Sequence, residues 1–279
     1  MLDETLNLND RKHTWNGFES VYDINLNYPI SAIHAPLLSG IGDLTIENML
    51  DADDIIVLFE MCRIADMYGK AQNKIITLVI HSESYLSLMT DVGGMYYKIR
   101  RTLDMLFKQY SNVRIAIENV SPLRNLGKGK VLHLSNNFGY DNVCLVKQLK
   151  EDLQTDRIGT ILDTCHSMIT EKYMSAIFKE IGNYVEPEDY SMERFFAENK
   201  DVIFHIHFAD MKGCGYGKGN HGISFTEETK RKAYSILDLY KKYAYTCPLC
   251  IEVEEPDGYE INTGFKTTKQ IILDYFTED

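Results

Sequence analysis

Residues 158–166 have the sequence Ile-Gly-Thr-Ile-Leu-Asp-Thr-Cys-His, and this run sets the architecture expected for the whole chain. Ile158–Leu162 is a short apolar run of the kind that forms a buried parallel strand. Asp163 follows it directly, and His166 opens the next loop or helix. Because the carboxyl ends of parallel strands converge on one mouth of a barrel, we expect both side chains to point into that mouth. The plainer alternative is an Asp that caps a helix, followed by an incidental His.

Five further apolar runs end in the same way, at a residue type that can bind a metal ion. They end at His34, His81, Glu118, His207 and Glu252. The chain has 8 His and 41 acidic residues among 279, fewer than one position in five, so six such endings in six runs are not expected by chance. The pattern predicts parallel strands that bring three imidazoles and three carboxylates to one metal-centred active site.

Amphipathic helical stretches lie between these strands, at 54–67, 95–110, 171–181, 192–199, 227–243 and 267–276. Alternating strands and helices predict a parallel sheet with right-handed crossovers. Six β/α units from residue 30 onward almost fill a TIM-type (β/α)₈ barrel, but two further units need roughly 60 residues and only about 30 precede the first strand. We therefore expect one α/β domain over 1–279, a barrel shortened or incomplete at its N-terminal side, with 1–29 as an irregular segment. That segment or a second chain would cover the gap, and the second chain would make a homodimer.

The overall charge and hydropathy argue against two classes of function, nucleic-acid binding and insertion into a membrane. A formal net charge of −12 weighs against nucleic acid as a partner, since duplex-binding proteins present basic faces to phosphates. No apolar run approaches the roughly 18 residues that a membrane span needs. The acidic and polar stretch at 1–10 does not have the pattern of a signal peptide, so we expect a cytoplasmic protein without membrane contact.

Two of the strand ends suggest specific chemistry. Glu118 closes an apolar strand, and a carboxylate there needs a cation or a hydrogen-bond network because burying it alone is costly. Asn119, the next residue, could orient that carboxylate or contact substrate. Glu252 directly follows the last apolar run, and we prefer it to Glu254, which has the same strand parity. A mixture of imidazole and carboxylate ligands suits Zn²⁺ or Mn²⁺, with Fe²⁺ and Co²⁺ as further candidates.

The stretch around the fifth strand end carries several more polar groups. His205 and His207 share one strand face, and we expect His207 at the mouth with His205 in a lower interior layer. Asp210 is expected to be a ligand or a partner of an imidazole, and Lys212 to meet an anionic group of the substrate. The loop after it contains five glycines and ends near His221, so it either folds over a ligand or is a surface loop.

Taken in order along the chain, these motifs resemble those of the xylose-isomerase-like TIM barrel superfamily. The superfamily contains sugar and sugar-phosphate isomerases and epimerases and also the endonuclease IV enzymes. The resemblance covers about residue 30 to the C-terminus and rests on His34-Ala-Pro36, Ile117-Glu-Asn119, Asp163-Thr-Cys-His166, His207-Phe-Ala-Asp-Met-Lys212 and Ile251-Glu252.

The resemblance implies a role for each matched residue. It implies a core metal site of Glu118, Asp163, His207 and Glu252. His166 is implied as a substrate contact or a ligand of a second metal. His34, His81 and His221 resemble the extra imidazoles with which endonuclease IV holds three zincs. That enzyme has an Asp two residues before the counterpart of His221, whereas this chain has Gly219.

Three functions follow from this resemblance. The first is a metal-dependent sugar or sugar-phosphate isomerase or epimerase, in which the metal stabilises an enediolate while Glu118 and Glu252 transfer the proton. The second is an endonuclease IV-like zinc phosphodiesterase acting on abasic DNA, which the histidine count favours and the net charge opposes. The third is a non-catalytic member of the same barrel family. The acidic chain favours the first, with a small sugar as substrate.

Overall fold

A computed structural model describes residues 26–35, 38–39, 42–43, 54–81, 92–121, 123–125, 130–132, 139–181, 190–212, 221–255 and 261–277. Its main sheet has six strands, in the order β1 (Ala32–His34), β4 (Ile76–His81), β5 (Val113–Glu118), β8 (Ile158–Asp163), β9 (Ile203–Phe208) and β10 (Leu249–Ile251). Strand order follows chain order, which is the pattern of successive β/α units. The predicted parallel β/α architecture is confirmed.

Helices alternate with these strands as the sequence predicts. They are α2 (Asp54–Gln72), α3 (Val92–Gln109), α4 (Gly139–Leu153), α5 (Thr164–Ile181), α6 (Met192–Asn199), α7 (Lys230–Tyr243), which follows the 3₁₀ turn η6 (Glu227–Thr229), and α8 (Thr263–Thr277). Two small antiparallel hairpins were not predicted, β2 (Leu38–Ser39) with β3 (Gly42–Asp43) and β6 (Leu123–Asn125) with β7 (Lys130–Leu132). Strands of two or three residues are too short to show a period in the sequence.

The predicted strand ends agree with the structure to within one residue. β1, β4, β5 and β8 end at His34, His81, Glu118 and Asp163, as expected. β9 continues one residue beyond His207, and β10 ends one residue before Glu252. The backbone N–H of Glu252 still donates to the carbonyl of Phe208 at 3.3 Å, so Glu252 prolongs the β9–β10 pairing beyond the assigned strand.

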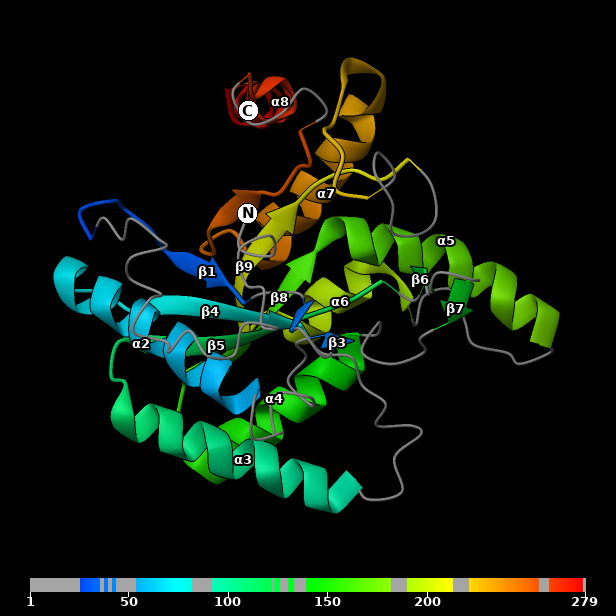
Figure 1. Ribbon diagram of the computed structural model, residues 1–279. Helices are drawn as coiled ribbons and strands as arrows, with labels where there is room; N and C mark the ends of the chain where they lie inside the picture. The colour runs from blue at the N-terminus through cyan, green and yellow to red at the C-terminus, as the bar shows by residue number, and fades with distance from the viewer. Residues whose placement is uncertain are drawn as a thin grey trace. The chain divides into compact units, whose positions relative to one another are not determined.

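The chain divides into two compact units. Unit 1 comprises residues 1–117 and 149–158. In it β1 pairs in parallel with β4, and α2 packs on both strands (Figure 1). The guanidinium of Arg157 donates to the carbonyls of Tyr110 and Phe107, both at 2.6 Å, and so satisfies carbonyls at the end of α3 that have no helical partner.

Unit 2 comprises residues 118–148 and 159–279. Here β9 pairs in parallel with β8 on one side and with β10 on the other, and α7 packs against α8 (Figure 1). Fully buried aromatic side chains fill the space under the helices, including Phe196, Phe208 and Phe225. The rings of Phe208 and Phe225 stack with centroids 4.6 Å apart. This packing fixes the strand ends of unit 2, which carry the polar groups described below.

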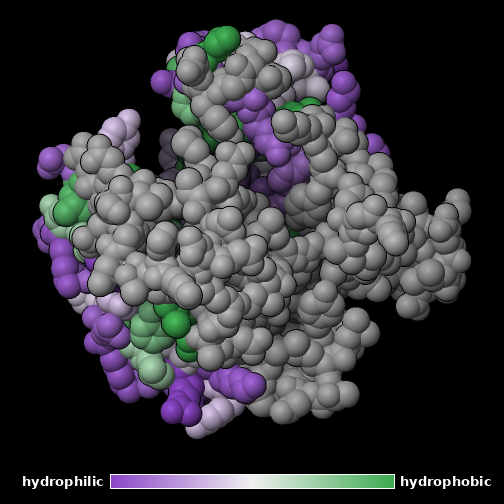
Figure 2. Space-filling model, viewed as in Figure 1, coloured by the Kyte–Doolittle hydropathy of each residue, from purple (hydrophilic) through white to green (hydrophobic). Residues whose placement is uncertain are grey.

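Residues 1–25 lie outside the described ranges, so the irregular N-terminal segment, its covering role and the single domain stay predictions of the sequence. Figure 2 shows hydrophobic surface as small separate patches among hydrophilic residues in the described part of this face. None of the helices in that part of the chain combines the length and the apolar character that a membrane crossing requires.

Candidate metal centre

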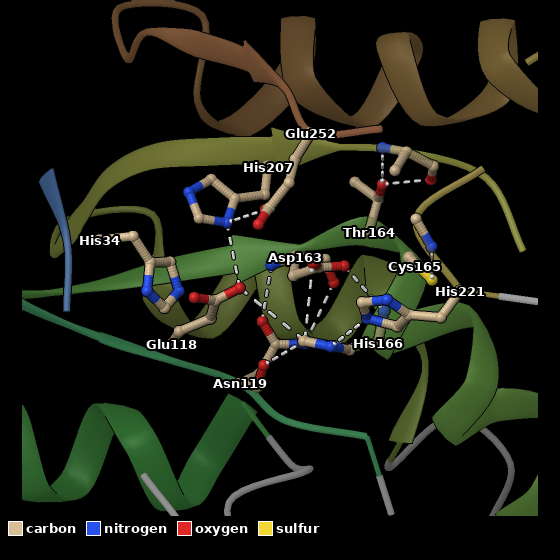
Figure 3. Close-up of polar contacts among 12 residues, drawn as sticks. His34, Glu118, Asn119, Asp163, Thr164, Cys165, His166, His207, His221 and Glu252 are labelled. Carbon is tan, nitrogen blue, oxygen red and sulfur yellow. Dashed lines mark hydrogen bonds and ion pairs between the residues drawn. The ribbon is translucent and has the colours of Figure 1, made fainter. Parts of the chain in front are cut away.

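Four of the predicted ligands converge in unit 2. β8 and β9 are in parallel register with Asp163 opposite His207, and neighbouring residues in a parallel pair point to the same face of the sheet. Glu118 ends β5, and Glu252 follows β10. One ligand atom from each of these four residues lies within 4.8 Å of the others (Figure 3). The predicted convergence of these side chains is therefore present.

His207 lies at the centre of this group. Its Nδ1 is 3.0 Å from Oε1 of Glu118 and also forms an ion pair with Oε2 of Glu252 (Figure 3). Glu118 and His207 are buried, whereas 43% of the Glu252 side chain is exposed. The two carboxylates therefore differ in access to water, although both contact the same imidazole nitrogen.

The group is rich in negative charge. Burial, together with the charges of Glu252 and Glu118, raises the pKa of Asp163 from 3.8 to about 7. Burial on its own lowers the pKa of His207, but the same two carboxylates raise that pKa by more, so the net shift is well upward. Three carboxylates and one imidazole form a donor set that suits a divalent transition metal, whose charge would offset the repulsion that raises the pKa of Asp163. The residues present therefore fit the implied metal.

Asn119 joins the ends of β5 and β8. Its side-chain amide donates to the carbonyl of Asp163 at 3.1 Å, and its side-chain oxygen accepts from the backbone N–H of Asp163 at 2.7 Å. The sequence suggested that Asn119 would orient Glu118 or contact substrate. Its side-chain hydrogen bonds hold the backbone of Asp163, so it positions another carboxylate of the group, and a contact with substrate stays a prediction.

A second group lies beside the first, where α5 begins. Oδ1 of Asp163 accepts from the backbone N–H of His166 at 2.8 Å, so Asp163 caps α5 in addition to facing the first group. Nε2 of His166 lies 2.6 Å from Nε2 of His221 (Figure 3). Burial, and then the neighbouring His166, lower the pKa of His221. Asp163, His166 and His221 each offer a ligand atom within 4.8 Å of the others.

Comparison with solved structures places this geometry in a known architecture. The crystal structure of a D-tagatose 3-epimerase-like protein matches with a TM-score of 0.57 and 16% sequence identity, over 95% of this chain and 84% of that chain. The fold is therefore that of a TIM-type barrel. A xylose isomerase domain protein from Planctomyces limnophilus matches with a TM-score of 0.53 and 11% identity, over 90% of this chain and 77% of that chain.

The apo form of 3-keto-D-glucoside 4-epimerase from E. coli matches with a TM-score of 0.50 and 10% identity, over 89% of this chain and 79% of that chain. No protein-family profile and no curated protein matches the sequence. At these identities the structural likeness establishes the fold, and any activity has to be argued from the site.

Three contacts hold the segment that delivers His221 in this barrel. The backbone N–H of Gly222 donates to Sγ of Cys165 at 3.3 Å, and its carbonyl accepts from the N–H of Glu254 at 2.6 Å. Ile223 forms an antiparallel bridge with Asp210. Gly222 has φ of +60°, which side chains rarely adopt, so the turn requires glycine. This role of Gly222 was not predicted, because it is one of five glycines in the loop and the sequence does not distinguish it from the other four.

The carboxylate of Asp210 pairs with a lysine, and the role expected of Lys212, a contact with an anionic group of the substrate, stays a prediction. Asp210 is buried, and its carboxylate forms an ion pair with Lys232 of α7 and accepts from the N–H of Met211 at 2.6 Å. It belongs to neither ligand group of unit 2 in the described residues. Lys212 is exposed. Residues 213–220, including Gly219, lie outside the described ranges, so the expected loop over a ligand stays a prediction.

The two remaining predicted imidazoles belong to unit 1. His34 ends β1 and His81 ends β4, and their rings meet edge to face with centroids 4.9 Å apart. Nδ1 of His34 also lies 2.6 Å from the carbonyl oxygen of Ala35. Adjacent parallel strands thus bring these two strand-end histidines together, as the sequence predicts.

Proposed function

We propose that the protein is a metal-dependent isomerase or epimerase of sugars or sugar phosphates. The observation that carries this proposal is the convergence of Glu118, Asp163, His207 and Glu252 at strand ends of a xylose-isomerase-like barrel. Two of the matching structures are described as a D-tagatose 3-epimerase-like protein and a 3-keto-D-glucoside 4-epimerase, so the fold is already used for sugar epimerisation. Zn²⁺ or Mn²⁺ is the expected metal, with Fe²⁺ and Co²⁺ as alternatives.

A bound divalent cation supplies positive charge against the negative charge that develops on substrate oxygens when a carbon-bound proton is removed. Asp163 and His207 would hold the cation, together with the carboxylates of Glu118 and Glu252. The buried Asn119 keeps Asp163 in place through its two hydrogen bonds. The cation site would thus be held mainly by residues that solvent does not reach.

Glu118 and Glu252 would act as the acid–base pair. Glu252 has the more exposed side chain and can exchange its proton with water, whereas Glu118 is buried and keeps a proton away from solvent. Two carboxylates in such different surroundings suit the removal of a proton by one group and its return by the other. Both carboxylates face Nδ1 of His207, the ring nitrogen that would bind the cation beside them.

The proposal is tested by proton exchange in D₂O. Ketoses, aldoses and their phosphates are incubated with protein loaded with Mn²⁺, Co²⁺ or Zn²⁺, and NMR follows the loss of one carbon-bound proton and the appearance of an isomer. Glu252→Gln should slow the exchange by about 10²–10⁴-fold. Glu254→Gln is the matched control, since that side chain is exposed two residues further on. The proposal fails if no sugar exchanges a proton, or if the two variants lose activity equally.

A second function, an endonuclease IV-like zinc phosphodiesterase, is favoured by the additional ligand group of Asp163, His166 and His221. The net charge of −12 opposes binding to DNA. Elemental analysis separates the two candidates, since one metal per chain supports the isomerase and three support the phosphodiesterase. The third reading, a non-catalytic barrel, would show neither proton exchange nor cleavage. The homodimer and the cytoplasmic location stay predictions, and light scattering of the purified chain tests the first.

A further inference from the structure

His205 is a buried imidazole that the proposed reaction does not use. It lies on β9 two residues before His207, so both side chains point to the same face of the sheet. His205 is 4% exposed and His207 is 5% exposed. Nε2 of His205 lies 3.1 Å from Nε2 of His207, which is a hydrogen-bond distance. Figure 3 shows His207 beside Glu118 and Glu252.

The two nitrogens of His207 face different surroundings. Nδ1 faces Glu118 and Glu252, and Nε2 faces His205. A neutral imidazole carries one N–H, and a ring nitrogen that gives its lone pair to a cation carries no proton. If Nδ1 of His207 faces the cation, the proton of that ring must be on Nε2. The N–H of Nε2 then points at His205.

A hydrogen bond between two imidazole nitrogens needs one donor and one acceptor. With the proton on Nε2 of His207, Nε2 of His205 must accept, and the proton of His205 must therefore be on its Nδ1. Ligand histidines in metal sites generally donate their second N–H to a carboxylate, a carbonyl or water, which fixes the tautomer and the ring orientation. In this chain the group at hydrogen-bond distance from Nε2 of His207 is another imidazole from the same strand.

We propose that His205 is a positioning residue for the metal centre, which accepts a hydrogen bond from Nε2 of His207 and thereby holds Nδ1 toward the carboxylates. This inference rests on the cation site of the proposed function. It assigns to His205 no contact with the substrate and no part in proton transfer. Its effect is on how tightly the site binds the cation.

The test compares cation affinity in three variants. His205→Gln keeps an acceptor oxygen near the position of Nε2, and His205→Leu removes the acceptor. Ile203→Ala is the control for a buried truncation on the same strand, because Ile203 is buried, pairs with Thr160 before the register shift in β9, and packs in the apolar core with Ile206. Titration calorimetry with Mn²⁺ or Co²⁺, and the visible absorption of the Co²⁺-loaded protein, measure affinity and ligand geometry independently of activity. Thermal unfolding of each metal-free variant reports whether it is folded.

We expect His205→Leu to weaken cation binding by about 10–100-fold and to change the Co²⁺ spectrum. His205→Gln should keep most of the affinity, and Ile203→Ala should lower the unfolding temperature with little change in affinity. Equal affinity in His205→Leu and the unaltered protein would overturn the inference, as would equal losses in the Leu and Gln variants. If the unaltered protein binds no cation, the proposed function itself fails.

A measurement on the unaltered protein covers the case in which His205→Leu does not fold. Long-range ¹⁵N–¹H NMR of the metal-loaded protein, with Zn²⁺ as the diamagnetic ion, identifies which nitrogen of each imidazole carries the proton. We expect the proton of His207 on Nε2 and that of His205 on Nδ1. A proton on Nε2 of His205 would show that His205 is the donor, and would overturn the inference.

Discussion

Replacing Asp163 with Asn should stabilise the metal-free protein at neutral and alkaline pH. The carboxyl is buried beside Glu118 and Glu252, and these surroundings raise its pKa from 3.8 to about 7. The unfolded chain therefore releases this proton near its ordinary pKa, whereas the folded chain holds it until about pH 7. Between those values the folded state binds more protons, so raising the pH destabilises it, and the loss is complete above about pH 7.

The size of this effect follows from the shift. A difference of about three pKa units, at about 1.4 kcal/mol per unit, corresponds to at most about 4 kcal/mol. Asparagine removes the charge and keeps an oxygen that can accept from the N–H of His166, so the cap of α5 is preserved. The variant also gives up the attraction of Asp163 for His207 and His221, which offsets part of the gain. We expect a net gain of about 2 kcal/mol, or roughly 4–8 °C in Tm.

The assay is thermal unfolding of chelator-treated protein from pH 4 to pH 8. The difference in Tm between Asp163→Asn and the unaltered protein should grow as the pH rises and become constant above about pH 7. Asp201→Asn is the control, because Asp201 is exposed in the turn before β9. Added Mn²⁺ or Zn²⁺ should raise the Tm of the unaltered protein and leave that of Asp163→Asn almost unchanged. A variant that is less stable than the unaltered protein at pH 8, or a difference independent of pH, would refute the reasoning.

Three further predictions follow from the same contacts. Elemental analysis should find roughly one to three transition-metal ions per unaltered chain. The double variant Glu118→Gln, Asp163→Asn should lose tight metal binding, and an unchanged metal content in that variant would exclude the site. Lys232→Met leaves the buried Asp210 without its lysine and should lower the free energy of unfolding, measured in urea, by about 2–3 kcal/mol. Lys232→Arg is the control and should be about as stable as the unaltered protein. Equal stabilities of the Met variant and the unaltered protein would mean that the ion pair contributes nothing. Binding to duplex DNA at physiological salt should be weak or absent at a net charge of −12, and salt-sensitive submicromolar binding with cleavage at an abasic site would instead favour the phosphodiesterase.

The strand ends could be predicted from the sequence because they depend on a local pattern and one general rule. A β-branched run such as 158–162 indicates a buried strand wherever it occurs, and parallel strands bring their carboxyl ends to the same edge. This pattern and this rule are sufficient to predict that Glu118, Asp163 and His207 lie together. The β/α alternation was visible for the same reason, since helical and strand periods differ clearly.

The partners of individual polar groups could not be predicted in this way. Asp210 was expected to be a metal ligand or a partner of an imidazole, and in the structure its carboxylate pairs with Lys232 of α7. Asn119 was expected to orient Glu118 or to contact substrate, and in the structure its side-chain amide holds the backbone of Asp163. In each case the sequence showed that a buried polar group needs a partner. The choice of partner depends on the position of a separate helix or strand, which a local pattern does not contain.

For His205, the position could be predicted from the sequence and the partner could not. The strand period places residue 205 on the same face as His207, so its interior position was predictable, but its distance from the ligand ring was not. A side chain two residues below a ligand on a parallel strand is well placed to contact that ligand from within the barrel. When a metal binds one nitrogen of the ligand imidazole, the other ring nitrogen carries the N–H. An imidazole two residues earlier on the strand can accept a hydrogen bond from that N–H. On the proposal made for His205, the sequence His205-Ile-His207 at a strand end would supply both a ligand and the group that orients it. In a barrel with a ligand group at its strand ends, a polar residue two positions before a ligand histidine is thus a candidate positioning residue that the sequence alone can suggest.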